Sequence, residues 1–142
     1  EEEAKRLTEN ALQMFPDEFS LLHTAATFHF SQGEFDRAEE LFRRILSRNP
    51  HHTASRYNLA LLLWETGRRR EAISLLQELI QMNPGYNNAY ISLVKMYRAM
   101  GSDEEIQSLR GRAPAEIAPF FDTIPSDSFP ASGEAISPAT EP

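Results

Sequence analysis

A spacing of 34 residues recurs along most of the sequence and constrains the fold more than any other feature. Three glycines and three prolines each keep this spacing: Gly33, Gly67 and Gly101, and Pro16, Pro50 and Pro84. Two independent markers with one period indicate an internal repeat. A unit of this length cannot bury its own apolar face, so neighbouring units must stack and share a continuous core.

Each unit carries the apolar pattern of helices. In residues 35–48 the apolar side chains recur at spacings of three and four, which is the pattern of a helix with one buried face. Read in the same way along the chain, the pattern predicts seven helices: 2–14, 18–31, 35–48, 53–66, 69–82, from about 87 to just before Gly101, and from 103 to about 112.

The residues between these helices carry stop and start signals. Pro16 ends the first helix, and Asp17 or Glu18 can begin the next. Gly33 suits a left-handed turn residue, because a glycine has no Cβ to clash. Ser102 is expected to be the N-cap of the last helix, with Glu105 completing a capping box.

Composition and charge exclude several classes of protein. The chain has 142 residues and no cysteine, so it has neither a disulfide framework nor a thiolate zinc site. Residues 1–113 hold 16 acidic and 14 basic residues, a balance that argues against nucleic-acid binding. The longest apolar run, residues 59–64, is far too short to span a membrane.

The two ends of the sequence differ from its middle. The sequence opens with EEEAKR, without a Met and inside an expected second helix of a repeat, so we expect a piece of a longer protein. Since this start is unlike a signal peptide, a soluble, cytoplasmic chain is favoured over a secreted one. Residues 114–142 hold five acidic residues, no Lys or Arg, and six of the nine prolines. They are expected to be non-helical and mobile.

Small residues stand at the expected helix–helix contacts, bulky ones at the following helix position, and prolines at the helix ends: Ala26 with Ala38, Ala60 with Ala72, Phe42 and Leu76, and Pro16, Pro50 and Pro84. Together with the 34-residue period, these residues resemble the tetratricopeptide repeat. The resemblance implies an all-α fold, an α-solenoid of antiparallel helix pairs wound as a right-handed superhelix. It predicts a half repeat over 1–18, full repeats over 19–52 and 53–86, a degenerate repeat over 87–113, and an irregular acidic Pro/Ser-rich tail over 114–142.

Some positions depart from the family pattern. Arg56 stands where the family has a large apolar residue. In the last repeat Val94 and Ile106 replace the small pair, and Arg110 replaces the bulky apolar residue. Either this last helix pair packs more widely, or its outer face is covered by something else.

In this family the first helices of the repeats, the A helices, line a concave surface, which implies a peptide-binding groove. Helical phase predicts its lining from all three repeats: His23, Thr24, Thr27, Phe30, Tyr57, Asn58, Leu61, Trp64, Asn88, Ile91, Lys95 and Arg98. The aromatic and apolar members would form the floor, the asparagines would bind a peptide backbone, and the two cations would attract an acidic group. The plainer interpretation makes the large apolar members core between repeats and the cations solvated surface charges. Of the family's carboxylate-clamp residues only Asn58 matches, so no such clamp is predicted.

Other polar groups fit no catalytic or metal site. His51 and His52 are adjacent in a turn, and His23 and His29 point from different helix faces, so neither pair is a metal site. Residues 68–70, three consecutive arginines, are either a contact for an acidic partner or a solvated turn. We find no nucleophile beside a base and no phosphate loop, so we expect no enzyme activity and no cofactor.

The sequence therefore predicts a non-catalytic scaffold for a protein or peptide partner. The tail segment with Phe120, Phe121 and Ile124 is a possible ligand for its own repeats or for those of another copy. A linker to a further domain is the alternative for this tail. The alternatives for the whole chain are a substrate-presenting region of a larger enzyme and a self-assembly module.

Overall fold

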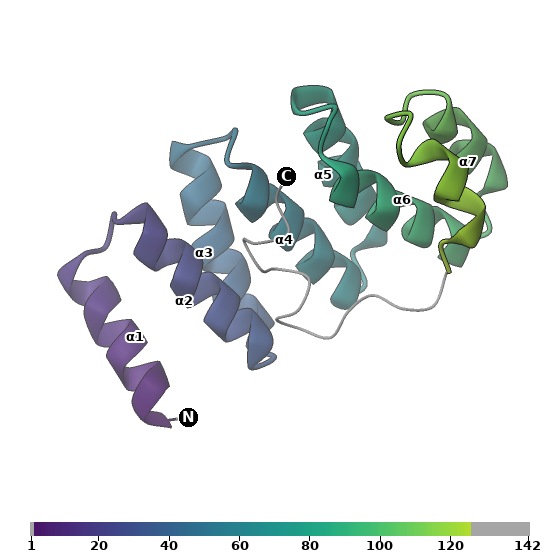
Figure 1. Cartoon of the computed structure of the whole chain (residues 1–142). Helices are drawn as coiled ribbons and strands as arrows, with labels where there is room; N and C mark the ends of the chain where they lie inside the picture. Colours follow the sequence, from purple (N-terminus) through teal and green to yellow (C-terminus); the bar gives the residue numbers. More distant parts are fainter. Residues whose placement is uncertain (1, 126–142) are drawn as a thin grey trace.

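A computed structural model describes residues 2–125, and these form a single row of helices without a β-strand (Figure 1). The elements are α1 (Glu2–Met14), α2 (Phe19–Ser31), α3 (Phe35–Arg48), α4 (Thr53–Glu65), α5 (Arg69–Met82), α6 (Asn87–Ala99), α7 (Asp103–Arg110) and the 3₁₀ helix η1 (Ala118–Thr123). The predicted all-α solenoid of antiparallel helix pairs is confirmed.

The helix ends follow the turn chemistry of the sequence. Gly33, Gly67 and Gly101 have φ values of 76°, 88° and 71°, the left-handed conformation that glycine adopts without strain. Glu18 is the N-cap of α2 and accepts a hydrogen bond from the Ser20 backbone N–H. The capping box expected at the start of α7 is wrong, because the side chain of its N-cap residue makes no capping hydrogen bond.

The pairs α2–α3 and α4–α5 make the most extensive helix contacts, and α3 packs on α4 and α5 on α6. Small residues permit a close approach within each pair. The alanines predicted for these contacts and the bulky residues that follow them are fully buried: Ala26, Ala38, Ala60, Ala72, Phe42 and Leu76. Arg56, which departs from the family pattern, lies at the edge and donates hydrogen bonds to Glu78 and to the carbonyl oxygen of Pro50.

The outer face of the last pair is covered by the chain itself. Val94 and Ile106 are buried between α6 and α7. Beyond them η1 packs on α7, with Phe121 fully buried and Ile124 against the core. Residues 118–123 are therefore helical, and the expectation that the whole tail would be non-helical is wrong for this segment. The rest of the tail, residues 126–142, lies outside the described residues.

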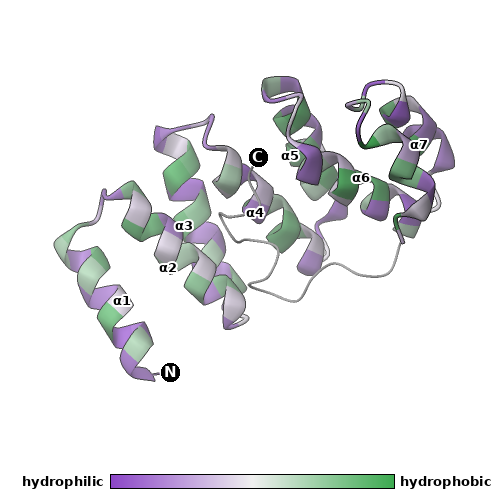
Figure 2. Cartoon of the chain, viewed as in Figure 1, coloured by the Kyte–Doolittle hydropathy of each residue, from purple (hydrophilic) through white to green (hydrophobic). Residues whose placement is uncertain are grey.

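The N-terminal helix is less well covered. Its only buried side chain is Leu12, whereas Leu7, Met14 and Phe15 near it are exposed. In Figure 2, α1 at the N-terminal end of the row carries hydrophobic and hydrophilic residues along its whole length. None of the helices within residues 2–125 is long and apolar enough to cross a membrane.

Candidate interaction surfaces

The helices α2, α4 and α6 present equivalent positions 34 residues apart. Thr27, Leu61 and Lys95 form one such row across the three helices. Leu61 is buried, whereas its equivalents on α2 and α6 are half-buried. In this row the middle side chain is therefore closed to solvent, and the two outer side chains are partly accessible.

Two equivalent hydrogen bonds join successive A helices. The Asn58 amide donates to Nε2 of His23 at 3.3 Å, and the hydroxyls of Tyr57 and Ser92 are 2.9 Å apart. Both members of the second pair stand 34 residues after those of the first. An amide NH₂ group only donates, so the His23 ring accepts and is neutral in this contact. Burial lowers the pKa of His23, and the nearby His52 ring lowers it further.

The twelve predicted groove residues thus differ in access. The large or central ones are buried: Phe30, Tyr57, Asn58, Leu61 and Trp64. The others are half-buried or exposed: His23, Thr24, Thr27, Asn88, Ile91, Lys95 and Arg98. Asn58 is only 1% exposed, and its amide hydrogen bond serves the contact between repeats.

Arg98, at the end of this face, contacts the tail segment. Its Nη2 donates to the carbonyl oxygen of Phe121 at 2.9 Å. Arg110 also contacts this segment: its Nη2 lies 2.5 Å from Asp122 Oδ1, and its guanidinium is 5.8 Å from the centre of the Phe121 ring. The Arg110 hydrogen bond lowers the pKa of Asp122. Arg98 and Arg110 therefore bind two neighbouring residues of η1, Phe121 and Asp122, at the C-terminal end of the row.

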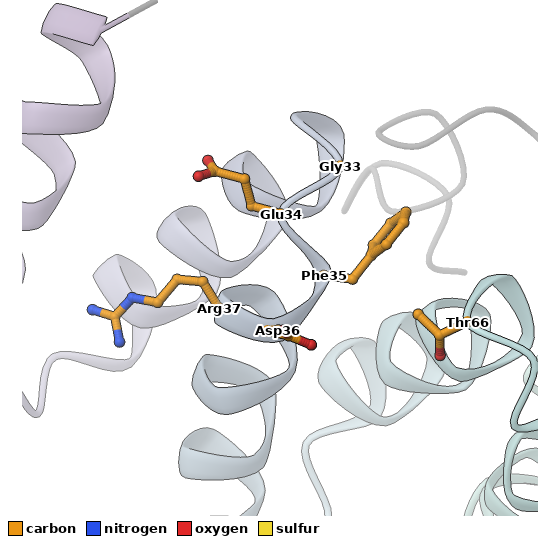
Figure 3. A pocket seen from close by; sticks show the side chains of 6 residues that line it. All are labelled: Gly33, Glu34, Phe35, Asp36, Arg37 and Thr66. Carbon is orange, nitrogen blue, oxygen red and sulfur yellow. The ribbon is translucent and has the colours of Figure 1, made fainter.

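The turns within the repeats carry a second series of equivalent features. A pocket of about 450 Å³ at the α2–α3 turn is lined by Gly33, Glu34, Phe35, Asp36, Arg37 and Thr66. In Figure 3, Phe35 and Thr66 extend toward one another across the pocket, whereas Arg37 points away toward α1. The Phe35 ring also packs edge-to-face on Phe30, with the ring centres 5.7 Å apart.

The next turn has an equivalent pocket with different chemistry. It measures about 510 Å³ and is lined by Gly67, Arg68, Arg69, Arg70, Glu71 and Met100. Where the first turn has Phe30 and Phe35, this turn has Trp64 and Arg69. The Arg69 guanidinium lies 4.4 Å from the centre of the Trp64 ring. Sequence reasoning considered the arginines but missed the pocket, although the 34-residue register would have aligned them with Glu34, Phe35 and Asp36.

A polar network joins α1 to the first repeat. His29 is 1% exposed, with Nε2 3.0 Å from Glu9 Oε1 and Nδ1 3.1 Å from Glu34 Oε1. Arg37 and Lys5 bind the same carboxylates, at 2.8 and 2.6 Å. Carboxylates only accept hydrogen bonds, so the protonated His29 ring is the form that satisfies both contacts.

This network places carboxylates and imidazole together without making a metal centre. In residues 2–125 no group of three or more His, Asp or Glu side chains is arranged to hold a metal ion. A hydrogen bond from Arg37 lowers the pKa of Glu9 against the opposing effect of burial, and one from Lys5 lowers that of Glu34. Glu9 and Glu34 are therefore charged carboxylates that accept the hydrogen bonds between α1 and the first repeat.

Comparison with known families identifies the repeats. The model of the tetratricopeptide repeat family matches residues 2–54 and 29–97. This chain belongs to the tetratricopeptide repeat family. The family assignment agrees with the row of helix pairs and with the small residues at their contacts.

Known relatives are much longer than this chain. Human tetratricopeptide repeat protein 7B is 28% identical over 101 residues, which cover 71% of this chain and 12% of that protein. The Drosophila melanogaster protein O-mannosyl-transferase Tmtc3 is 33% identical over 66 residues, covering 46% of this chain and 7% of the relative. The chain thus spans about an eighth or less of these proteins.

Solved structures share the fold. A MamA structure, MamA MSR-1 C2, superposes with a TM-score of 0.68 at 21% identity and covers 86% of this chain and 67% of that one. The MamA D159K mutant 2 matches equally well, with a TM-score of 0.68 over 89% of this chain and 66% of the other. At this identity the likeness concerns the fold.

Proposed function

We propose that the chain is a non-catalytic interaction module that binds a peptide or partner segment across the face of α2, α4 and α6. Tetratricopeptide repeats generally mediate protein–protein interactions, which supports the broad role. The site is supported by one observation in particular: accessible Thr27 and Lys95 stand in equivalent positions on either side of buried Leu61.

The chemistry of this face suggests the kind of peptide. Ile91 and Lys95 lie one helical turn apart on α6 and offer an apolar contact beside a cation. An apolar anchor next to an acidic group complements them. A peptide that reaches Asn58 has to replace its hydrogen bond with His23, so we place the polar contacts first at Thr24 and Thr27. For so small a surface we expect micromolar affinity, about −8 kcal/mol.

The test is a selection of binding peptides from a display library against the full chain. Binding is then measured for Thr27→Glu and Lys95→Glu, with Ser74→Glu on the exposed side of α5 as the matched control. The two face variants should weaken binding about tenfold or more, because each puts an acid against the selected ligand. Loss of binding in the α5 control alone would contradict the proposal.

We further propose that the segment 114–125 caps the array in place of the first helix of another repeat. The burial of Phe121 and the hydrogen bond from Arg98 support this role. Phe120, which was expected to take part, is 60% exposed and available to another contact. Docking of this segment on a second copy is the competing possibility, and it predicts a concentration-dependent exchange that a cap within one chain does not show.

A second candidate function is the presentation of a protein substrate within a larger enzyme. The relative named a protein O-mannosyl-transferase favours it, because this chain resembles a segment of a protein with that name. A catalytic domain beside this sequence in its parent gene would support this function, and its absence there would remove it.

Self-assembly is a third candidate, and the exposed apolar residues Leu7, Met14 and Phe15 favour it. Light scattering against protein concentration tests it directly. A mass that rises with concentration would support assembly, whereas a constant monomer mass would exclude it in that range.

A further inference from the structure

We infer that the pocket at the α4–α5 turn is a second binding site, one that takes an acidic linear segment of a partner chain with an apolar side chain next to its carboxylate. The pocket measures about 510 Å³. It lies at the turns of the repeats rather than on the face of α2, α4 and α6. Its test is therefore independent of the function proposed above.

The three arginines of this pocket differ in the contacts that they already make within the chain. Arg68 is tied to Glu39 of α3 by hydrogen bonds from both Nη atoms. The Arg69 guanidinium lies over the Trp64 ring, 4.4 Å from its centre, a contact that orients the cation and leaves its N–H groups able to bind a carboxylate. Arg70 is exposed, and within residues 2–125 no hydrogen bond or ion pair engages its guanidinium. Two cations, one of them preoriented, are thus presented to a ligand.

An apolar contact lies beside these cations. Met100 lines the same pocket and is 44% exposed, where the first turn has Thr66. A methionine side chain adapts to the shape of an apolar partner, so it suits an anchor that accompanies an acid. The site therefore combines a cation pair with an adaptable apolar wall, and the carboxylate of Glu71 in its lining is already bound by Arg43.

The chain itself shows this pairing at the next repeat. A pocket there includes Arg98 and Asp122 in its lining. The backbone of Phe121 accepts a hydrogen bond from Arg98, and the side chain of Asp122 binds Arg110. Within this chain, two arginines therefore already bind a segment in which an aromatic residue is followed by an acid.

The first turn supplies the reverse chemistry. Glu34 and Asp36 stand there at the positions of Arg68 and Arg70. An acidic segment is repelled by these carboxylates and attracted by the arginines, so the two equivalent pockets distinguish it by charge. We therefore place the acidic segment at the α4–α5 turn alone.

The probe is a synthetic peptide with the sequence of residues 117–129, IAPFFDTIPSDSF, added to the full chain. Binding is followed by calorimetry and by the emission of Trp64, the single tryptophan, which lies under Arg69. We expect saturable binding that weakens with added salt and shifts the emission. The same peptide with both aspartates replaced by asparagine should bind about tenfold more weakly or worse, because it loses charge-assisted hydrogen bonds.

Variants locate the site. Arg70→Glu should weaken binding about tenfold or more, since it replaces an attraction by a repulsion. Arg6→Glu, on α1 and also exposed, makes the same change in net charge and should leave binding unaltered. The inference is overturned if the peptide does not bind, if Arg70→Glu binds it as well as the natural chain, or if both charge reversals weaken it equally.

Discussion

The two ends of the helix row are closed by different kinds of contact. At the N-terminal end, α1 buries one leucine and is joined to the first repeat by His29, Glu9, Glu34 and their cations. At the C-terminal end, η1 buries Phe121 completely, and the arginines around it bind its edge. Each of these contacts covers the outer face of a terminal helix pair, which a stacked array of repeats requires.

The difference predicts how each end responds to a change. An apolar contact depends on the volume that it fills and hardly on pH, whereas a network of charged groups depends on protonation. The C-terminal end should therefore be sensitive to truncation of one side chain. The N-terminal end should be sensitive to acid.

The largest effect is expected for Phe121→Ala. Removal of a fully buried phenylalanine costs about 3–5 kcal/mol, which should release η1 from α7. Amide hydrogen exchange in residues 117–124 should then approach that of a random coil. Phe120→Ala is the control, since its exposed ring should contribute little. Equal exchange in the two variants would contradict a cap held by Phe121.

The next effect is the loss of the α1 contact in acid. Hydrogen bonds from Arg37 and Lys5 lower the pKa values of Glu9 and Glu34 from their ordinary value of 4.5. The unfolded chain therefore binds protons more readily, and the stabilisation is complete above pH 4.5 and lost as the pH falls through the lowered values. Nuclear magnetic resonance spectra recorded from pH 7 to 3 should show α1 detach before η1.

His23 provides an internal reference in the same series. Burial lowers its pKa from 6.5, so its stabilising effect should begin to decline once the pH falls below that value. The change should appear at the contact of α2 with Asn58 and not in α1. Simultaneous changes at both places would show that the α1 contact and the contact between α2 and α4 are one cooperative unit.

A smaller effect is expected for Glu9→Gln. The variant keeps the shape of the side chain but removes the charge that binds Arg37 and His29, which should cost about 1 kcal/mol at these partly exposed groups. Chemical denaturation with hydrogen exchange in α1 measures the loss. Glu3→Gln, on the exposed side of the same helix, should change stability by less than about 0.5 kcal/mol. A larger loss in the Glu3 variant would refute the proposed α1 contact.

The smallest effect is expected for Asp122→Asn. Its ion pair with Arg110 is exposed to solvent, and such pairs contribute little to stability. High salt should reduce even this contribution. If Asp122→Asn released η1 as fully as Phe121→Ala, the C-terminal end would be electrostatic and the contrast between the two ends would disappear.

Much of the fold was predictable because it depends on local periodicity. The 34-residue spacing and the apolar pattern predicted each of the seven α-helices to within about two residues, and Gly33 predicted the left-handed turn. The start of α2 was predicted at Asp17 or Glu18, and the structure shows that Glu18 is the capping residue. The capping box of α7 failed because a side-chain pattern permits this hydrogen bond without requiring it.

The contacts between distant segments were not predictable in the same way. Glu9 and Glu34 meet His29 only because α1 and the α2–α3 turn pack on the same side of α2, which no local pattern specifies. Helical phase assigned Asn58 to the groove, but it did not reveal the hydrogen bond with His23 that closes this position. Residues 118–123 have no sustained apolar period, so the local pattern could not predict their helix. This helix forms where the segment packs on α7.

The most direct test of the proposed function is chemical-shift mapping of the full chain with a peptide selected from the display library. The account predicts that the largest backbone shifts cluster on α2 and α6 around Thr27, Ile91 and Lys95, with smaller changes in buried α4. Shifts concentrated on the outer sides of α3 and α5, with α2 and α6 unchanged, would contradict it.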